Sequence, residues 1–292
     1  MNKTSPKFIV ILLVFCLLCY GLLLQPFTDY LHKKPFVERL GYTPNADLLK
    51  AVVADQKESV AAALIFKVIV YYGTLVEKAR GKIELPADYR AMSRTIHSGV
   101  KLDPYNMDGY YFAQAILAWD VGKIDVANAL LDYGMKFRNW DFQLPYFAGF
   151  NCAYFQEDYA NAAKYFQRAA ELSGNDLFVS LTGRYLQESG QTNLAIDYLA
   201  AMAKEARNPD IRNSFQLRLE AFRQVLKVEQ ARDGFVAVNG RLPVSIDELL
   251  VTGFLVSLPQ DPYGGTFFLE ADGKIRTTSK FALKRTPTSS GE

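Results

Sequence analysis

The side chains best able to do chemistry in this chain are few and widely separated. Its 292 residues include two histidines, His32 and His97. Neither has cysteine or carboxylate neighbours at the spacings of a metal or catalytic site. The sequence also contains no phosphate-binding glycine loop, nucleophile elbow or zinc-protease motif. We therefore predict no catalytic residue, no metal site and no cofactor, and the protein is not expected to be an enzyme.

The three cysteines do not indicate a disulfide or an activated thiol. Cys16 and Cys19 lie in an apolar amino-terminal segment, which leaves Cys152 alone in the rest of the chain. One thiol cannot form an intrachain bridge. Cys152 could act as a nucleophile, but Phe150 and Ala153 beside it are typical of a packed helix face, which favours a role in the core.

The charged residues do not indicate a nucleic-acid partner or a catalytic pair. Lys and Arg total 33 and Asp and Glu total 31, which gives a net charge of +2, and the two signs are interspersed. A nucleic-acid-binding surface would require clustered basic residues. Asp120, Asp125 and Asp132 are interpreted as the solvated surface of a helix pair, because most surface acids have no catalytic role.

The elements that carry these residues show a repeated pattern. A small residue recurs at spacings of 35 and 33 residues: Ala127, Ala162 and Ala195. A large apolar residue follows each of them by four positions, on the same helix face: Leu131, Phe166 and Leu199. A turn precedes each alanine by five residues: Gly122, Glu157 and Gly190. A period near 34 is typical of stacked helix-turn-helix units in which the alanine marks a close helix crossing.

This pattern resembles the tetratricopeptide repeat family. The unit 176–209 matches best, with Thr182-Gly183 at the family's Leu-Gly pair, and the unit 143–175 departs from the family at Gly149-Phe150. The unit 108–140 has Gly134 where an alanine is usual. The resemblance implies a mainly α fold, an α-solenoid of helix-turn-helix repeats. A generic helical bundle with coincidental alanines is the alternative.

In that family the first helices of the repeats line a concave groove that binds other proteins. The resemblance implies that the groove residues are Phe112, Ile116, Trp119, Phe147, Asn151, Tyr154, Ser180, Arg184 and Gln187. The early half of this set is aromatic and the later half is polar. The carboxylate clamp of some family members is missing, because Phe112 and Ile116 occupy its first two positions. The aromatic residues could instead be buried between helices.

The amino-terminal segment is interpreted as a membrane anchor. Residues 8–24 form an uncharged apolar run of 17 residues, about the shortest helix that crosses a hydrocarbon core near 30 Å. Small residues that would mark a cleavage site do not follow it, so an uncleaved anchor is favoured over a cleaved signal peptide. Basic residues flank both sides, so charge leaves the orientation open. The simplest insertion places the soluble part in the periplasm of a bacterial cell.

A prolyl-rich juxtamembrane segment, 28–57, precedes the repeats. The strongly apolar stretch 58–80 contains Lys67, and we interpret it as a buried helix in preference to a second membrane span. A partner helix with Met92, Ile96 and Val100 on one face follows, and the pair forms a degenerate repeat before the three clear ones. The repeat region as a whole is 58–210.

The region 211–283 has a different character. It begins with a long helix that caps the repeats and ends at Gly240. A short helix follows, and Ser245 and Glu248 form its capping box. Two strands, 266–270 and 274–279, then flank Asp272-Gly273, a pair that supplies the positive dihedrals of a tight hairpin. The order Gly-Arg-x-Pro, Gly-x-Leu and Leu-Pro-x-Asp-Pro-x-Gly resembles the carboxy-terminal segment of major pseudopilins of type II secretion. That likeness would allow calcium at Asp261 and Asp272, although a turn-forming role is favoured.

The sequence therefore predicts five regions: a cytoplasmic tail and transmembrane anchor (1–27), a juxtamembrane segment (28–57), repeats (58–210), a helix with a small α+β module (211–283) and a disordered tail (284–292). The predicted function is a membrane-anchored scaffold that binds other proteins of a bacterial envelope assembly, such as a secretion or pilus system, at the inner membrane. The alternative is a membrane-tethered hydrolase whose repeats recruit substrate.

Overall fold

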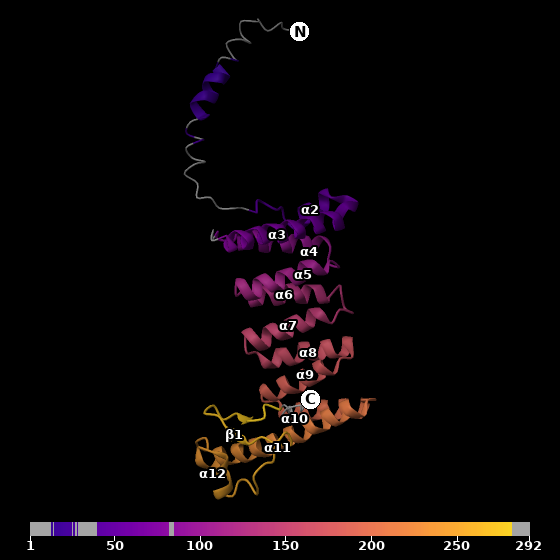
Figure 1. Cartoon of the computed structure of the whole chain (residues 1–292), viewed down its shortest axis with the longest axis vertical. Coiled ribbons are helices and arrows are strands. Elements are labelled where there is room, and N and C mark those ends of the chain that lie inside the picture. Colours follow the sequence, from indigo (N-terminus) through magenta and orange to yellow (C-terminus); the bar gives the residue numbers. More distant parts are fainter. Residues whose placement is uncertain are drawn as a thin grey trace, which may run out of the picture. The chain divides into compact units, whose positions relative to one another are not determined.

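A computed structural model describes residues 40–81 and 85–281, together with residues 13, 15–24, 26 and 28. These residues are mainly α-helical, and a small antiparallel sheet lies near the carboxyl end (Figure 1). The chain divides into two compact units, Met1–Asp103 and Pro104–Glu292. His32 and the predicted tail 284–292 lie outside the described residues.

The first unit contains helices α2 (Ala46–Val52), η1 (Ala54–Gln56), α3 (Lys57–Arg80) and α4 (Tyr89–Leu102). Helices α3 and α4 pack closely at Gly99, where an added Cβ would lie 2.8 Å from Cδ1 of Ile65. The predicted inner face of α4 is confirmed, because Met92, Ile96 and Val100 are each at most 1 % exposed.

The prediction that the stretch 58–80 is a buried helix is wrong for most of its surface. Helix α3 buries one stripe, made of Ala61, Ile65, Val68, Tyr71 and Leu75. Phe66 and Val70 on its other side are exposed. Within the described residues, the continuous helix Ala54–Arg80 is the one long and apolar enough to cross a membrane, and only 28 % of its most apolar window is buried. In the predicted anchor, the described apolar helix Phe15–Leu24 is shorter.

The second unit begins with helices that follow one another along the chain. Their bounds are α5 (Met107–Gln114), η2 (Ala115–Asp120), α6 (Ile124–Met135), α7 (Gln143–Phe155), α8 (Tyr159–Ser173), α9 (Asp176–Glu188), α10 (Thr192–Glu205) and α11 (Pro209–Asn239). Each helix packs against the next one in sequence, and Figure 1 shows this order. Most of the contacts within this array are therefore between neighbours along the chain.

Short polar side chains begin several of these helices. Asp158 accepts a hydrogen bond from the backbone N–H of Asn161 before α8, and Asn175 accepts one from Leu177 before α9. Asn208 does the same for Asp210, and Pro209 follows at the first helical position. These caps satisfy N–H groups that have no partner inside a helix, so they fix where each helix starts.

The three predicted turn residues share one backbone conformation. Gly122, Glu157 and Gly190 have φ values of +66°, +53° and +78°. Glycine adopts this left-handed region without cost, whereas a residue with a Cβ is strained there. The repeated turn is therefore confirmed as a local structure, and Glu157 is the one of the three that carries strain.

The predicted packing residues all lie in the core. None of the six is more than 2 % exposed: Ala127, Leu131, Ala162, Phe166, Ala195 and Leu199. An added Cβ at Gly183 would lie 3.0 Å from Leu199, and one at Gly149 would lie 3.2 Å from Phe166. Gly149 and Gly183 thus allow the same close approach of two helices. At Gly149-Phe150 the glycine lies one position earlier than in the family pattern, but the close crossing of the two helices is kept.

The first helix pair contains a feature that the repeat pattern does not predict. Helix η2 is a six-residue π-helix that continues the eight-residue α5. Together they are one residue longer than α7 or α9, which have 13 residues each. A π-helical turn accommodates one extra residue within a helix and is frequent at functional sites. The wider turn here lies directly before Gly122.

The long helix α11 belongs to two hydrophobic cores. Phe215 and Phe222 in its first half pack with α8, α9 and α10. Val228 and Phe235 in its second half pack with helix α12 (Ile246–Val251) and the sheet. The predicted end at Gly240 is confirmed, with φ of +68° at that residue.

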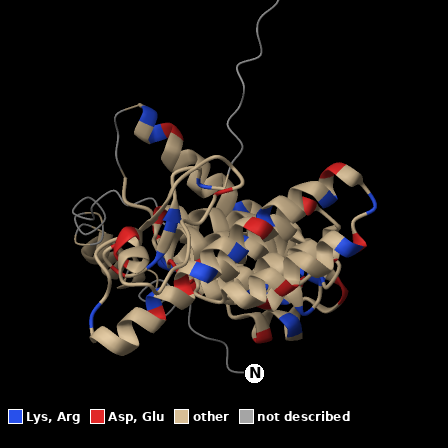
Figure 2. Cartoon of the chain, turned by 90° about the horizontal axis from the view of Figure 1, so that it is seen from below, with Lys and Arg blue, Asp and Glu red and all other residues tan. Residues whose placement is uncertain are grey.

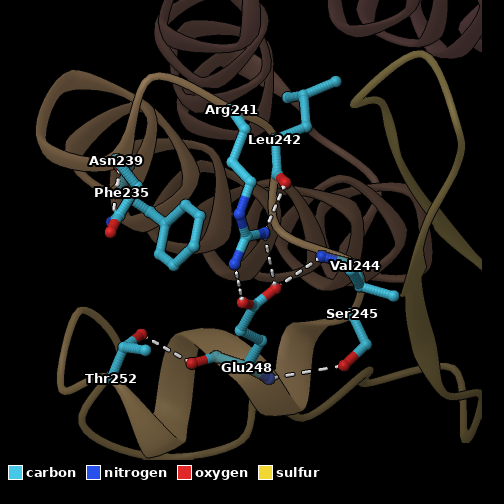
Figure 3. Close-up of polar contacts among 8 residues, drawn as sticks. All are labelled: Phe235, Asn239, Arg241, Leu242, Val244, Ser245, Glu248 and Thr252. Atoms are coloured by element: carbon cyan, nitrogen blue, oxygen red, sulfur yellow. Dashed lines mark hydrogen bonds and ion pairs between the residues drawn. The ribbon is translucent and has the colours of Figure 1, made fainter.

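Figure 3 shows the loop that joins α11 to α12. Two guanidinium nitrogens of Arg241 donate to the carboxylate of Glu248, one of them at 2.5 Å, and the guanidinium lies 5.0 Å from the ring centroid of Phe235. Ser245 accepts from the N–H of Glu248, as predicted, while the Glu248 carboxylate accepts from Val244 instead of the cap residue. The Gly-Arg-x-Pro segment therefore fastens this loop through its arginine.

Strands β1 (Phe267–Leu269) and β2 (Ile275–Thr277) form the predicted hairpin, with Phe268 opposite Arg276. Its turn differs from the prediction, because Gly273 has a positive φ of +85° and Asp272 does not. The N–H of Gly273 donates to the carbonyl of Glu270, so the turn is closed one residue earlier. Asp272 instead accepts from the N–H of Lys274.

Candidate protein-binding surface

Four aromatic side chains gather in the second unit at the end of η2 and along α7. Trp119 lies 6.0 Å from Phe150, 5.7 Å from Tyr154 and 5.0 Å from Phe155, measured between ring centroids. Trp119 is 55 % exposed and Tyr154 is 63 % exposed. We call these four residues the aromatic surface. Large exposed aromatic side chains in contact with one another are typical of protein-binding sites.

The secondary structure explains why these side chains meet. Phe150 and Tyr154 are four residues apart on α7, so they share a face, and their rings are stacked at 5.4 Å. Trp119 is the fifth residue of the π-helical turn that ends the neighbouring helix. The ring of Phe155 lies nearly perpendicular to the rings of both Trp119 and Tyr154. The cluster is therefore built by two elements of the second unit and held by ring contacts.

Two further predicted residues lie in the same pair of helices. The ring of Phe147, which is half-buried on α7, packs edge-on against Tyr111 of α5 at 5.5 Å. Tyr111 is 58 % exposed, and Phe112 next to it is half-buried. The spacing rule did not select Tyr111, Phe150 or Phe155. For Phe150 and Phe155, the signal in the sequence was the density of aromatic residues in 146–155.

Three of the predicted groove residues do not reach the surface. Ile116 is 3 % exposed, Asn151 is fully buried and Gln187 is 6 % exposed. Side chains this deeply buried cannot form a docking surface, so the candidate surface excludes them. Trp119 and Tyr154 are exposed, as the prediction requires, but their role in partner binding stays a prediction.

A polar layer links the helices that carry the aromatic surface. Gln114 donates to Asn151, Asn151 donates to Asn128, and Asn128 donates to Gln156 at 3.4 Å. Gln156 in turn donates to Asp125 at 2.7 Å. Buried amides are costly unless they are paired, so this chain of hydrogen bonds ties α5, α6 and α7 in one register. Asn151 therefore links α7 to α5 and α6.

Cys152 lies in the same layer and is not an activated nucleophile. Burial, with a smaller contribution from the charge of Asp158, raises the pKa of this thiol to about 11. Its side chain is 3 % exposed and its sulfur accepts a hydrogen bond from Asn128. A buried thiol that stays protonated at neutral pH is chemically inert. The structure therefore agrees with the core role.

The predicted surface acids connect helices. Asp132 accepts from the hydroxyl of Tyr165 at 2.9 Å, and Asp125 accepts from Gln156. Burial and the Asp132 bond raise the pKa of Tyr165. Figure 2 shows basic and acidic residues interspersed along the helices. In the described part of the chain, His, Cys, Asp and Glu side chains do not gather in threes that could hold a metal ion.

The two aspartates considered for calcium have different surroundings. Asp261 is 8 % exposed and accepts hydrogen bonds from Thr277, Ser279 and the N–H of Tyr263. Its carboxylate thereby fixes the loop before β1 against β2. Asp272 is exposed and pairs with Lys274 at 3.3 Å. Each carboxylate is thus engaged in local structure.

The polar half of the predicted groove is covered by the chain itself. Arg218 of α11 donates to the carbonyl of Ser180 at 3.1 Å and to that of Phe281 at 3.2 Å. Arg276 of β2 forms an ion pair with Glu188 at the end of α9. The exposed side chain of Arg184 lines a cavity of about 430 Å³ together with Phe281. The hairpin and the residues after it therefore occupy the surface of α9.

Neither the protein-family models nor the curated protein sequences give a match to this chain. Its function must therefore be inferred from the residues themselves.

Proposed function

We propose that this protein is a membrane-tethered scaffold that binds another protein through the aromatic surface. The observation that carries the proposal is the contact of Trp119 with three other rings while more than half of its own surface stays exposed. Rigid aromatic side chains lose little conformational freedom on binding and bury a large area, so binding energy concentrates on them. The polar layer ties together the helices that carry these rings.

Three features support a tetratricopeptide-like solenoid as the framework of this scaffold. Helices of the second unit pack on their neighbours in sequence, the three turns share a left-handed residue, and Gly149 and Gly183 mark equivalent close crossings. Arrays of this kind present extended surfaces for other proteins. The long helix α11 then serves as the cap of the array.

Apolar helices support the membrane tether. The apolar helix Phe15–Leu24 belongs to the proposed anchor, and Ala54–Arg80 has the length and composition of a membrane-spanning helix. We place the protein at the bacterial inner membrane with the second unit in the periplasm. Partners would then be envelope proteins, with secretion or pilus-type assemblies as the favoured setting.

The test uses full-length protein in detergent and compares two tryptophans. Trp119→Ala should reduce recovery of the cross-linked partner from solubilised membranes, with a loss of about 2 kcal/mol or more in binding. Trp140→Ala is the matched control, because Trp140 is 58 % exposed and stacks on Tyr105 outside the aromatic surface. Thermal melting of both variants is measured in parallel.

Two results would contradict the proposal. Equal partner recovery with the two variants would show that the aromatic surface does not select the partner. A Trp119→Ala variant that binds normally but melts far earlier would show that the tryptophan serves packing alone, for which a loss of roughly 3–5 kcal/mol in stability is expected.

A further inference from the structure

Helix α3 leaves an apolar face uncovered in the first unit. Phe66, Val70 and Gly73 lie on the side away from its buried stripe, and Phe66 is 65 % exposed. Ala62 and Ala63 extend this side by one turn toward the amino end of the helix. We call these five residues the α3 face. Neighbouring apolar side chains that stay exposed mark a site for another protein or for a membrane.

Charged residues border the α3 face without entering it. Glu58 precedes it, Glu77 follows it, and both are exposed. Between these two glutamates, Lys67 is the one charged residue of the helix. Its ammonium group lies near the loop before α2, because a Cβ added at Gly41 would be 3.8 Å from Lys67 Nζ. The lysine therefore lies at the side of the helix and leaves the α3 face uncharged.

Helix α4 lies beside the middle of α3 (Figure 1). A Cβ added at Gly99 would meet Ile65, and the N–H of Asp88 donates to the hydroxyl of Tyr71 at 3.0 Å. These two contacts come in opposite order along the two helices, so the pair is antiparallel. If α3 crossed a bilayer, α4 would therefore enter the hydrocarbon region with it.

The outer side of α4 is unsuited to a hydrocarbon environment. Arg90, Arg94 and Lys101 are exposed there, and their spacings of four and seven residues place them on one helix face. Charged side chains at the centre of a bilayer are costly. The two helices together thus have one apolar outer side, on α3, and one basic outer side, on α4. This arrangement suits a helix pair that lies flat on a membrane, with α3 toward the lipid and α4 toward water.

The amino-terminal segment keeps a membrane within reach of α3. Under the proposed tether, the apolar helix Phe15–Leu24 belongs to the segment that is inserted in the bilayer. Residue 40, where the continuous description of the first unit begins, follows residue 28 by twelve positions. A chain extends at most about 3.6 Å per residue, so the unit stays within about 43 Å of the anchor. Such a link gives the lipid surface a high effective concentration at α3.

We propose that the α3 face binds the surface of a lipid bilayer, with α3 parallel to the membrane plane. The proposal rests on the membrane tether of the proposed function. Helices that bind in this way bury their apolar side about 5–10 Å into the boundary between headgroups and acyl chains. The ammonium group of Lys67 stays at the headgroups while its methylene groups lie in apolar surroundings. The first unit is then held by two contacts with the membrane, the anchor and α3.

The experiment measures quenching of tryptophan fluorescence by brominated lipids. Full-length protein is reconstituted in phosphatidylcholine vesicles, and Trp119 and Trp140, its two tryptophans, are replaced by phenylalanine. Phe66→Trp then places one reporter near the middle of Ala54–Arg80. Lipids brominated near the headgroup should quench it about twofold more strongly than lipids brominated near the chain end, because the ring lies in the boundary region.

Further reporters test the orientation of the helix. Ala62→Trp and Gly73→Trp both lie on the α3 face, eleven residues or about 16 Å apart along the axis. A helix parallel to the membrane gives both reporters the same depth, so their quenching should be equal. Arg94→Trp, on the outer side of α4, is the control and should not be quenched.

Two charge substitutions locate the contact. Val70→Asp puts a charge in the α3 face at an exposed position, so it should abolish most of the quenching of the Phe66→Trp reporter. Lys101→Asp changes the charge of the outer side of α4 and should leave that quenching unchanged. Equal effects of the two substitutions would contradict the assignment to the α3 face.

Three results with the reporters would overturn the proposal. Strongest quenching of Phe66→Trp by the chain-end lipid, with unequal quenching at Ala62 and Gly73, would show that α3 spans the bilayer. Blue-shifted emission of Phe66→Trp without lipid quenching would show that a second copy or another protein covers the face. Emission typical of water, again without quenching, would show that the face stays in solvent.

A reporter in the anchor separates this proposal from the tether itself. Leu17→Trp lies in the helix Phe15–Leu24. Quenching at Leu17 without quenching at Phe66 would refute the contact of α3 and keep the anchor. Shallow quenching at Phe66 without quenching at Leu17 would support the contact of α3 and refute the anchor. The measurement needs no partner protein, so it is independent of partner recovery through the aromatic surface.

Discussion

Aligned on their crossing glycines, helices α7 and α9 present different side chains to different surroundings. Each has a glycine at its crossing with the next helix, Gly149 and Gly183. One and five residues later, α7 carries Phe150 and Tyr154, whereas α9 carries Arg184 and Glu188. The aromatic pair borders solvent, with Tyr154 63 % exposed. The charged pair faces the chain's own hairpin, and the side chain of Glu188 is only 10 % exposed.

The difference shows how side-chain chemistry decides what binds to a helix face. On α9 a charged residue receives an arginine from a strand far along the chain, and the two together fasten a β-hairpin to the array. On α7 the described residues leave the aromatic surface uncovered, so it remains available for another molecule. The hairpin on α9 is thus an internal example of the docking that we propose for α7.

The largest expected effect concerns the ion pairs that hold the hairpin on α9. Arg276→Met removes the ion pairs to Glu188 and Glu270, and loss of charged hydrogen bonds should cost about 1.5–3 kcal/mol. Amide hydrogen exchange should rise at the end of α9 and in β2 while α7 stays protected. Lys274→Met, which removes an exposed pair, is the control. Equal exchange in the two variants would mean that the arginine does not hold the hairpin.

The next prediction concerns the helix crossing that supports α9. Ala195 is fully buried, so Ala195→Leu should overfill the space between α9 and α10 and cost on the order of 1–3 kcal/mol of stability. Ala201→Leu on the exposed side of α10 should have little effect. Chemical denaturation measures both. A midpoint unchanged by the substitution at Ala195 would contradict the close crossing.

A smaller effect, a gain in stability, is expected at the turn after α7. Glu157 ends the turn after α7 with φ of +53°, a conformation in which a Cβ is strained. Glu157→Gly should therefore stabilise the protein by about 1 kcal/mol. Gly190→Ala, at the equivalent turn after α9, should destabilise it by a similar amount. If both substitutions shift thermal melting in the same direction, the two turns are not equivalent.

The smallest expected effect is a pH dependence of the stability of the fold, and it arises from Glu229 on α11. Burial raises the pKa of Glu229 above its value of 4.5 in the unfolded chain, despite the hydrogen bond from Thr192 and the nearby charge of Arg232. The folded state then holds the proton more tightly, so this contribution to stability is present below pH 4.5 and is lost as pH rises through the folded pKa.

The Glu229→Gln variant has no carboxylate at this position, so it does not lose this stability as the pH rises. The melting temperature of the variant relative to wild type should therefore increase between pH 4 and pH 7 by a few degrees at most. Asp233→Asn, at the exposed partner of Arg232, serves as the control. A difference that shrinks toward neutral pH would show that the Glu229 carboxylate is well solvated.

The parts of the fold that local sterics determine were predictable from the sequence. The alanines at the crossings, the left-handed turns and the cap at Ser245 depend on residues within one or two helices, and their side-chain sizes reveal them. The hairpin was also predicted, although its turn uses one positive φ at Gly273 instead of two. Helix α3 was predicted as a helix, but its burial was predicted wrongly, because apolar composition does not tell which sides of a helix pack against a neighbour.

The candidate binding surface was only partly predictable. Trp119 and Tyr154 were selected correctly as exposed residues, but the spacing rule also selected Asn151 and Gln187, which are buried. The π-helical turn in η2 adds a residue that no periodic pattern contains. The hairpin covers α9 through a contact between Glu188 and Arg276. These two residues lie far apart in the sequence, so no periodic pattern predicts their contact.

Helix α11 gives the second unit a mechanical property. Its 31 residues would extend about 46 Å at 1.5 Å per residue, and Pro209 at the start is its only proline. Because one unbroken helix lies in both hydrophobic cores, it acts as a lever without a hinge. A force applied to the carboxy-terminal module would be transmitted along it to helices α8, α9 and α10, so the module and these helices should unfold as one cooperative body under load.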